Sequence, residues 1–82
     1  MIEELKKHLE EVTTFEADTA EALEAFRIKY LGKKGLLNTF FAALKDVPKE
    51  EKREFGQTVN TLKNAANEKW ETLKNKLESQ TS

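Results

Sequence analysis

The residues best suited to chemistry lie in one short stretch, residues 27–35, which reads Arg-Ile-Lys-Tyr-Leu-Gly-Lys-Lys-Gly. Four of these nine side chains are basic and none is acidic. Clustered cations with an aromatic ring among them are typical of surfaces that hold RNA or DNA by its phosphates. The stretch therefore predicts a site that binds a polyanion.

The net charge of −1 conceals this local field. Residues 1–24 carry eight acids and two lysines, whereas residues 25–36 carry four bases and no acid. If the helix that contains Arg27 continues as far as Lys34, then Arg27, Tyr30 and Lys34 share one of its faces. In this interpretation Tyr30 stacks on a base, and Lys33 and Lys34 reach phosphates. A second interpretation stays open, in which the bases complement the negative end of their own helix and Tyr30 packs in the core.

The sequence contains no recognisable catalytic arrangement. His8 is the single histidine, cysteine is absent, and His8 is expected at a surface or core boundary. Paired carboxylates such as Glu10-Glu11 are neighbours on solvated helices, with no pocket to raise their pKa values. The segment 32–35 is too short for a phosphate-binding P-loop, and no strand precedes it. We expect no catalysis by this chain alone, and no metal or cofactor bound to it.

Composition favours a small helical domain. A chain of 82 residues makes one domain at most. With 38% hydrophobic and 35% charged residues, it suits exposed helices packed along narrow seams. No signal peptide or membrane-spanning run is found, and the lack of cysteine fits a reducing compartment. We expect a cytoplasmic chain without a membrane partner.

Apolar residues recur at helical spacing along most of the chain. They predict a first helix over residues 2–13. A second helix is expected to begin at a capping box formed by Asp18 and Glu21 and to end at about Leu31, and a third to begin at Leu36. A last helix from about Pro48 to Leu77 would be roughly 45 Å long. Its apolar stripe consists of Phe55, Val59, Leu62, Ala66, Trp70, Leu73 and Leu77.

Two breaks divide these helices. Gly32 is expected in the left-handed conformation that often ends a helix, and residues 46–48 form the clearest turn. Phe40 and Phe41, between the breaks, are expected in the core. The prediction is an all-α fold, a long antiparallel, coiled-coil-like hairpin over residues 1–78. Its first arm is broken into shorter helices at Gly32–Gly35, its second arm is one long helix, and residues 79–82 form a frayed end or the start of a linker.

Polar side chains along the last helix allow two interpretations. They either extend the nucleic-acid surface or form an ordinary solvated face. They are Asn60, Lys63, Asn64, Asn67, Lys69, Lys74 and Lys76.

Residues 22–35 closely resemble the N-terminal domain of the bacterial phenylalanyl-tRNA synthetase alpha subunit. The mark of that family is an Arg, an aromatic-Leu-Gly-Lys-Lys-Gly core and a Leu shortly after, here Leu37. Val-Pro-Lys-Glu-Glu at 47–51 stands where the family often has Leu-Pro-Pro-Glu-Glu, so Lys49 replaces a frequent proline, and Arg53 replaces another. A second motif, Gly-x-x-x-Asn-x-x-Lys, is matched by Gly56, Asn60 and Lys63. Residues 1–19 match only in being helical and acidic.

This resemblance implies a tRNA-binding arm that positions tRNA for phenylalanine attachment. The family is a heterotetrameric class II enzyme, so the implied partners are tRNA, the rest of the alpha subunit and a beta subunit. ATP and Mg²⁺ would bind a catalytic domain outside this chain. The matching positions imply phosphate contacts by Arg27, Lys29, Lys33 and Lys34, with weaker ones by Asn60 and Lys63. Gly56 is expected to permit close helix approach. The alternative is a helical protein-interaction or spacer module that binds no RNA.

Overall fold

The computed structural model describes residues 2–80. They form the helices α1 (Ile2–Thr14), α2 (Ala20–Leu31), α3 (Leu36–Ala43) and α4 (Lys49–Gln80), with a short 3-10 helix, η1 (Leu44–Asp46), before α4. No strand occurs in this range, and the molecule is a rod of 50 × 20 × 14 Å. The all-α prediction is confirmed. Residues 81–82 of the expected frayed end lie outside the described residues.

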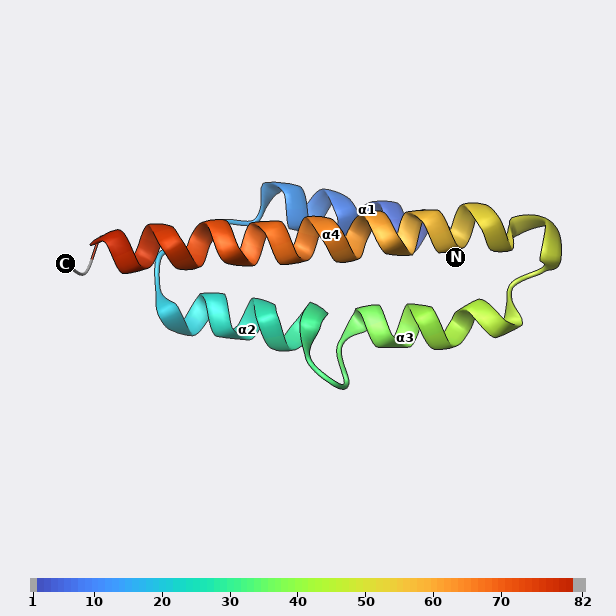
Figure 1. The fold of residues 1–82 in the computed structure, drawn as a ribbon, viewed down its shortest axis with the longest axis horizontal. Coiled ribbons are helices and arrows are strands. Elements are labelled where there is room, and N and C mark those ends of the chain that lie inside the picture. Colours follow the sequence, from blue (N-terminus) through green and yellow to red (C-terminus); the bar gives the residue numbers. More distant parts are fainter. Residues whose placement is uncertain (1, 81–82) are drawn as a thin grey trace.

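The hairpin is also confirmed. Helices α2 and α3 follow one another in line and run antiparallel to α4, with the turn at 46–48 joining the two arms (Figure 1). The last helix begins at Lys49, and the backbone N–H groups of Glu51 and Lys52 donate to the carbonyl of Pro48 at 2.9 and 3.0 Å. Pro48 thus starts the helix without needing an N–H of its own.

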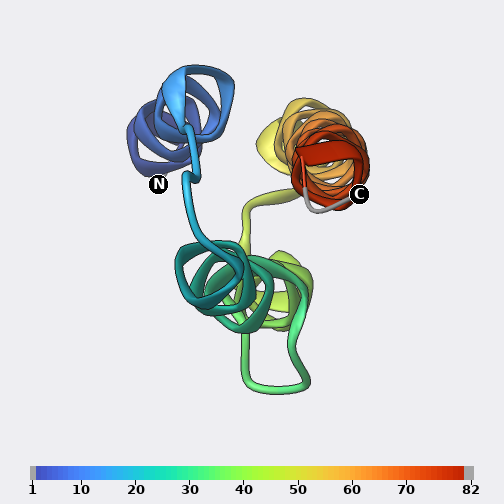
Figure 2. The same ribbon diagram turned by 90° about the vertical axis from the view of Figure 1, so that its left-hand side faces the viewer.

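Helix α1 occupies a place that the sequence pattern did not predict. The pattern led us to expect the earlier helices end to end in one arm. Instead, α1 runs beside α4 in the same direction, and an end-on view shows three rods, namely α1, α4 and the α2–α3 arm (Figures 1 and 2). Leu5 and Val12 of α1 are fully buried. The apolar stripe of α4 is therefore covered from two sides, which buries more surface than a hairpin of two arms alone.

The core follows the predicted stripes, with one exception. Phe55, Val59, Leu62 and Ala66 of α4 are almost completely buried. Phe40 is buried as predicted, but Phe41 is 40% exposed, so its prediction as a core residue is wrong. On the short helix α3, Leu37 and Phe40 already fill the inward face, and the next residue points away from it.

The start of α2 differs from the predicted capping box. Thr19, not Asp18, is the N-cap: its backbone is extended, and its hydroxyl accepts a hydrogen bond from the Ala22 N–H at 3.1 Å. In the preceding segment, the Phe15 ring stacks on the Phe26 ring of α2, with centroids 4.4 Å apart. This stacking holds the connection between α1 and α2 against the core.

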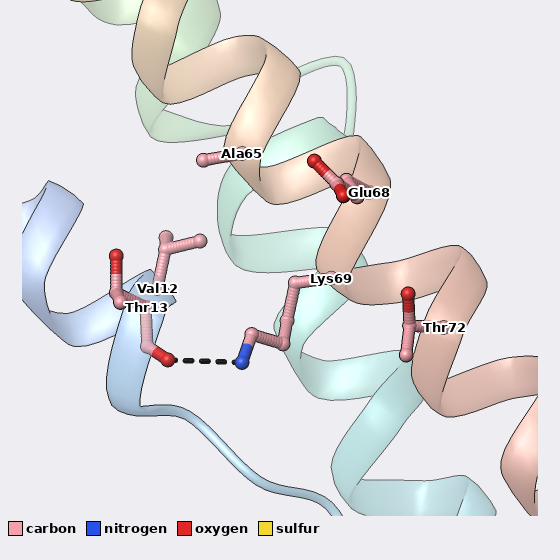
Figure 3. Close-up of a pocket in the computed structure, with 6 residues that line it drawn as sticks. All are labelled: Val12, Thr13, Ala65, Glu68, Lys69 and Thr72. Atoms are coloured by element: carbon pink, nitrogen blue, oxygen red, sulfur yellow. Dashed lines mark hydrogen bonds between the residues drawn. The ribbon is translucent and has the colours of Figure 1, made fainter.

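Lys69 ties the end of α1 to the long helix. Its ammonium donates to the backbone carbonyl of Thr13 at 2.9 Å, across a groove that Val12 and Ala65 help to line (Figure 3). Helix α1 has no basic residue in its own last turn, so this lysine supplies the cation that a helix C-terminus favours.

Candidate nucleic-acid interface

The loop between α2 and α3 carries two exposed cations of the basic stretch, Lys33 and Lys34. The Gly35 N–H donates to the Gly32 carbonyl at 2.9 Å, which makes Gly32–Gly35 a tight turn with Lys33 and Lys34 at its centre. This turn projects away from the three rods (Figures 1 and 2). Both lysines are exposed, and neither forms an ion pair with any residue in the range 2–80. Their charge is free to meet an external anion.

The two glycines are needed for space rather than for unusual dihedral angles. Gly32 and Gly35 have φ values of −69° and −74°, so the predicted left-handed conformation of Gly32 is wrong. A Cβ on Gly32 would lie 2.8 Å from the Ile28 carbonyl oxygen, and one on Gly35 would lie 2.8 Å from that of Tyr30. The chain therefore folds back on its own backbone more closely than a side chain allows.

Asn38 holds the loop in this shape. Its side-chain nitrogen donates to the carbonyls of Gly32 and Lys33, at 3.2 and 2.8 Å. Helix α3 begins directly after the loop and has no acid in its first turn, unlike α1, α2 and α4. The positive end of this helix and the two lysines therefore add to one local field.

The other two basic residues of the stretch already have acidic partners. Arg27 pairs with Glu24 one turn earlier, with its Nε 3.0 Å from the carboxylate. This hydrogen bond lowers the pKa of Glu24 and raises that of Arg27. The Nζ of Lys29 lies 3.5 Å from Glu11 of α1 and 5.4 Å from the centre of the Tyr30 ring. Both cations remain partly exposed but are partly neutralised.

Tyr30 is a core residue, which contradicts its predicted role in stacking on a base. Only 2% of it is exposed, and its hydroxyl donates to Glu11 at 2.9 Å and lies 3.1 Å from His8 Nδ1. The predicted shared face of Arg27, Tyr30 and Lys34 is wrong too, because α2 ends at Leu31. For Tyr30, the second interpretation of the sequence, which placed its ring in the core, holds.

His8 was expected at a core boundary, and its side chain is indeed part-buried. Its ring meets Tyr30 edge-on, with centroids 5.7 Å apart, and lies equally far from the Phe40 ring. The sequence carried no signal for the link between His8, Glu11 and Tyr30, because Tyr30 lies 22 positions from His8 and 19 from Glu11.

The polar side chains of α4 do not form one track. Lys69 faces α1, and the Nζ of Lys74 sits 5.0 Å above the Trp70 ring. Lys63 instead lines a groove that includes Asn38 and Phe41 of α3. Of the predicted contacts on α4, Lys63 therefore lies near the basic loop, and exposed Asn60 precedes it by one helical turn.

Gly56 does not mark a tight helix crossing. A Cβ there would meet Leu44 at 3.9 Å, an ordinary contact, so the expectation that this glycine permits close approach is wrong. We find no structural requirement for it.

Neither a cluster of metal ligands nor a membrane span is found in residues 2–80. No group of three or more His, Cys, Asp or Glu side chains gathers among them as metal ligands would. No helix in this range is both long and apolar enough to cross a membrane.

The fold and this surface define an all-α arm with one basic projection. The family described as the N-terminal domain of class II aminoacyl-tRNA synthetases matches residues 18–82, and the chain belongs to this family. Its relatives include phenylalanine–tRNA ligase alpha subunits from Christiangramia forsetii, 56% identical over 95% of the chain, and Flavobacterium johnsoniae, 48% identical over 96%. The corresponding subunit of Phocaeicola vulgatus is 44% identical over 98%.

These matches confirm the resemblance to the N-terminal domain of that subunit. The chain spans 23% of the length of each of these three relatives. No solved structure matches it.

Proposed function

We propose that this chain is a tRNA-binding arm of a phenylalanine–tRNA ligase alpha subunit. The observation that carries the proposal is the pair Lys33 and Lys34, exposed and unpaired on a loop that Asn38 holds in place. A preorganised pair of cations loses less freedom on binding phosphate than cations on a mobile segment would. The names of the relatives supply the class of RNA.

The other predicted contacts have secondary roles in this proposal. Arg27 and Lys29 must share their charge between Glu24 or Glu11 and any phosphate, so each contributes less than a free lysine. Lys63 reaches the RNA from α4, on the side of the groove next to the loop. Asn60 extends this contact by one turn as a neutral hydrogen-bonding group.

In the whole enzyme, this arm positions tRNA and a separate catalytic domain attaches phenylalanine. ATP and Mg²⁺ belong to that domain, and the rest of the alpha subunit and a beta subunit are the protein partners of a cytoplasmic heterotetramer. The part played by the 82 residues themselves is binding without catalysis.

The alternative, a module that docks other proteins through apolar stripes, fits less well. The stripes of α1, α2 and α4 face one another inside the rod. In the part of the chain that the structure describes, the large apolar side chains left exposed are Ile28 and Phe41. No continuous apolar seam is free for a partner helix, as helix-in-groove recognition requires.

Titration with unfractionated tRNA tests the proposal. The amide resonances of residues 27–38 and of Lys63 should shift at low salt, and the affinity should fall steeply as salt rises. The amides of Asp46 and Val47, in the turn at one end of the rod (Figure 1), serve as an internal control and should not shift. Salt-insensitive binding, or no shifts at low salt, would contradict the proposal.

A further inference from the structure

A groove beside the lysine loop combines an open aromatic ring with amide and cationic side chains. It lies where the end of α2, the start of α3 and the middle of α4 meet, and its volume is about 270 Å³. Its walls include Leu31, Leu37, Asn38, Phe41, Lys63 and Asn67. None of the functional roles proposed above explains why an aromatic ring stays open in this position.

Phe41 is the unusual member of this groove. Its neighbour Phe40 is buried, whereas Phe41 keeps 40% of its surface exposed. A single exposed apolar residue is common on proteins and needs no explanation by itself. Here, however, the ring borders a groove whose other walls supply a lysine and two amides, which is a combination suited to a flat, polar-edged and anionic ligand.

The charge of the groove narrows the choice of ligand. Three other surface grooves each have a carboxylate in their walls, namely Glu68, Glu11, and the pair Glu3 and Glu51. The groove at Phe41 is lined by Lys63 and by no acid. It also adjoins the loop, because Asn38, one of its walls, donates to the carbonyl of Lys33 at 2.8 Å. An anion held by the loop would therefore have the groove directly beside it.

We propose that this groove receives one unpaired RNA base, stacked on Phe41, with Asn67 at the edge of the base and Lys63 at its phosphate. The inference rests on the proposed function and adds a base contact to what is otherwise binding of phosphates. Unpaired bases of RNA loops commonly stack on aromatic side chains. Such stacking tolerates any sequence, because every base has a π-face. The Asn67 amide has no hydrogen-bond partner in the range 2–80 and offers both a donor and an acceptor.

Two probes separate stacking from charge. Oligouridylate presents phosphates together with unpaired bases, and inorganic polyphosphate presents charge alone. Phe41→Ala should weaken the binding of oligouridylate about 5- to 150-fold, the range typical of base–aromatic stacking, and leave the binding of polyphosphate unchanged. Phe41→Leu, which preserves apolar packing but not the ring, should weaken the binding of oligouridylate to a similar degree. Phe41→Tyr, which keeps an aromatic ring, should bind oligouridylate as the unmodified chain does.

Ile28→Ala is the matched control, since Ile28 is also exposed but does not line the groove. It should leave both affinities unchanged. If Phe41→Ala lost affinity for both probes equally, Phe41 would have a structural role, and the inference would be overturned. Unchanged oligouridylate binding in Phe41→Ala would overturn it as well. The proposed function would survive that result if Lys33→Ala and Lys34→Ala still weakened the binding of both probes. It would fail if neither probe bound the unmodified chain.

Occupation of the groove by another part of a longer polypeptide is a separate outcome. If the Phe41 ring is shielded from solvent in the complete subunit without RNA, and added oligouridylate leaves its resonances unchanged, the groove holds protein and the inference is wrong. A ring that stays accessible and shifts with oligouridylate supports it.

Discussion

The hydroxyl of Tyr30 donates a hydrogen bond to the carboxylate of Glu11, 2.9 Å away, and so joins α2 to α1. The same carboxylate oxygen lies 3.5 Å from Lys29 and 3.4 Å from His8. One acid on the first helix therefore holds the aromatic residue of the basic stretch inside the core and partly neutralises the lysine beside it. Because Arg27 is likewise paired with Glu24, Lys33 and Lys34 are the cations of the stretch without an ion-pair partner within residues 2–80.

The first prediction concerns the ionisation of Tyr30, the only tyrosine in the chain. Burial, together with the hydrogen bond to Glu11, raises its pKa well above the usual value of 10. In the folded protein, tyrosinate absorbance should therefore appear at higher pH than in the urea-unfolded chain. Because the unfolded state loses this proton first, the free energy of unfolding should fall as pH rises above 10. Titration of Tyr30 at its usual pKa in the folded protein would contradict the buried position.

The second prediction concerns Glu11 and stability in acid. The hydrogen bond from Tyr30, and then the charge of Lys29, lower the pKa of Glu11 below its usual value of 4.5. As the pH falls, the Glu11 carboxylate is therefore protonated in the unfolded chain before it is protonated in the folded protein. Its contribution to the free energy of unfolding is present above pH 4.5 and is lost below it. Glu11→Gln should flatten the acid limb of a plot of unfolding free energy against pH.

Glu10→Gln is the control for this experiment. Glu10 is adjacent and exposed, and its carboxylate forms no ion pair within residues 2–80. An acid limb that responds equally to both substitutions would show that general charge, and not the contact with Tyr30, sets the acid stability.

The sequence predicts local elements well because their causes are local. Apolar spacing placed all four helices within a few residues, and Pro48 marked the turn between the arms. The basic loop was also visible, since its lysines and glycines are consecutive in the chain. The family resemblance is the source of the proposed partner, tRNA, which no spacing of residues could specify.

Long-range packing was not predictable in the same way. The apolar stripe of α1 is compatible with a place in line with α2 and α3 or with a separate rod beside α4. Which of the two forms depends on how much of the apolar surface of α4 the α2–α3 arm leaves uncovered (Figure 2). Tyr30 belongs to a basic motif, yet Glu11 and His8, both distant in sequence, decide its position. Gly32 was correctly predicted as a break but for the wrong reason, because a close backbone carbonyl is not visible in a sequence.

The third prediction compares the same substitution at two glycines. Gly35→Ala should destabilise the fold by about 1–3 kcal/mol, because its Cβ would lie 2.8 Å from one backbone carbonyl oxygen and 2.9 Å from another. Gly56→Ala should instead stabilise it by about 1 kcal/mol, since the position is helical and its Cβ meets only Leu44 at 3.9 Å. Urea unfolding measures both. Changes of the same sign would refute this account of the glycines.

The fourth prediction concerns the tether of α1. Lys69→Met keeps an apolar stem of similar length but removes the donor to the Thr13 carbonyl. It should lower the free energy of unfolding by about 1 kcal/mol. Hydrogen exchange should quicken in the last turn of α1 more than in α3. Lys76→Met, on an exposed part of the same helix, is the control and should change neither quantity. Uniformly faster exchange would mean that Lys69 supports the whole rod instead of the end of one helix.

The last prediction concerns the two loop lysines. If each contacts one phosphate, Lys33→Ala and Lys34→Ala should each lower the slope of log affinity against log salt by about one and weaken different tRNAs to a similar degree. The substitutions should leave the fold intact, because both side chains are exposed and the loop is held through backbone carbonyls. Lys6→Ala and Lys7→Ala form a matched control pair, since these lysines are also adjacent and exposed but lie on the acidic helix α1. An equal loss of slope in the control pair would show that net charge alone drives binding, and a loss confined to one tRNA would show that the loop reads bases.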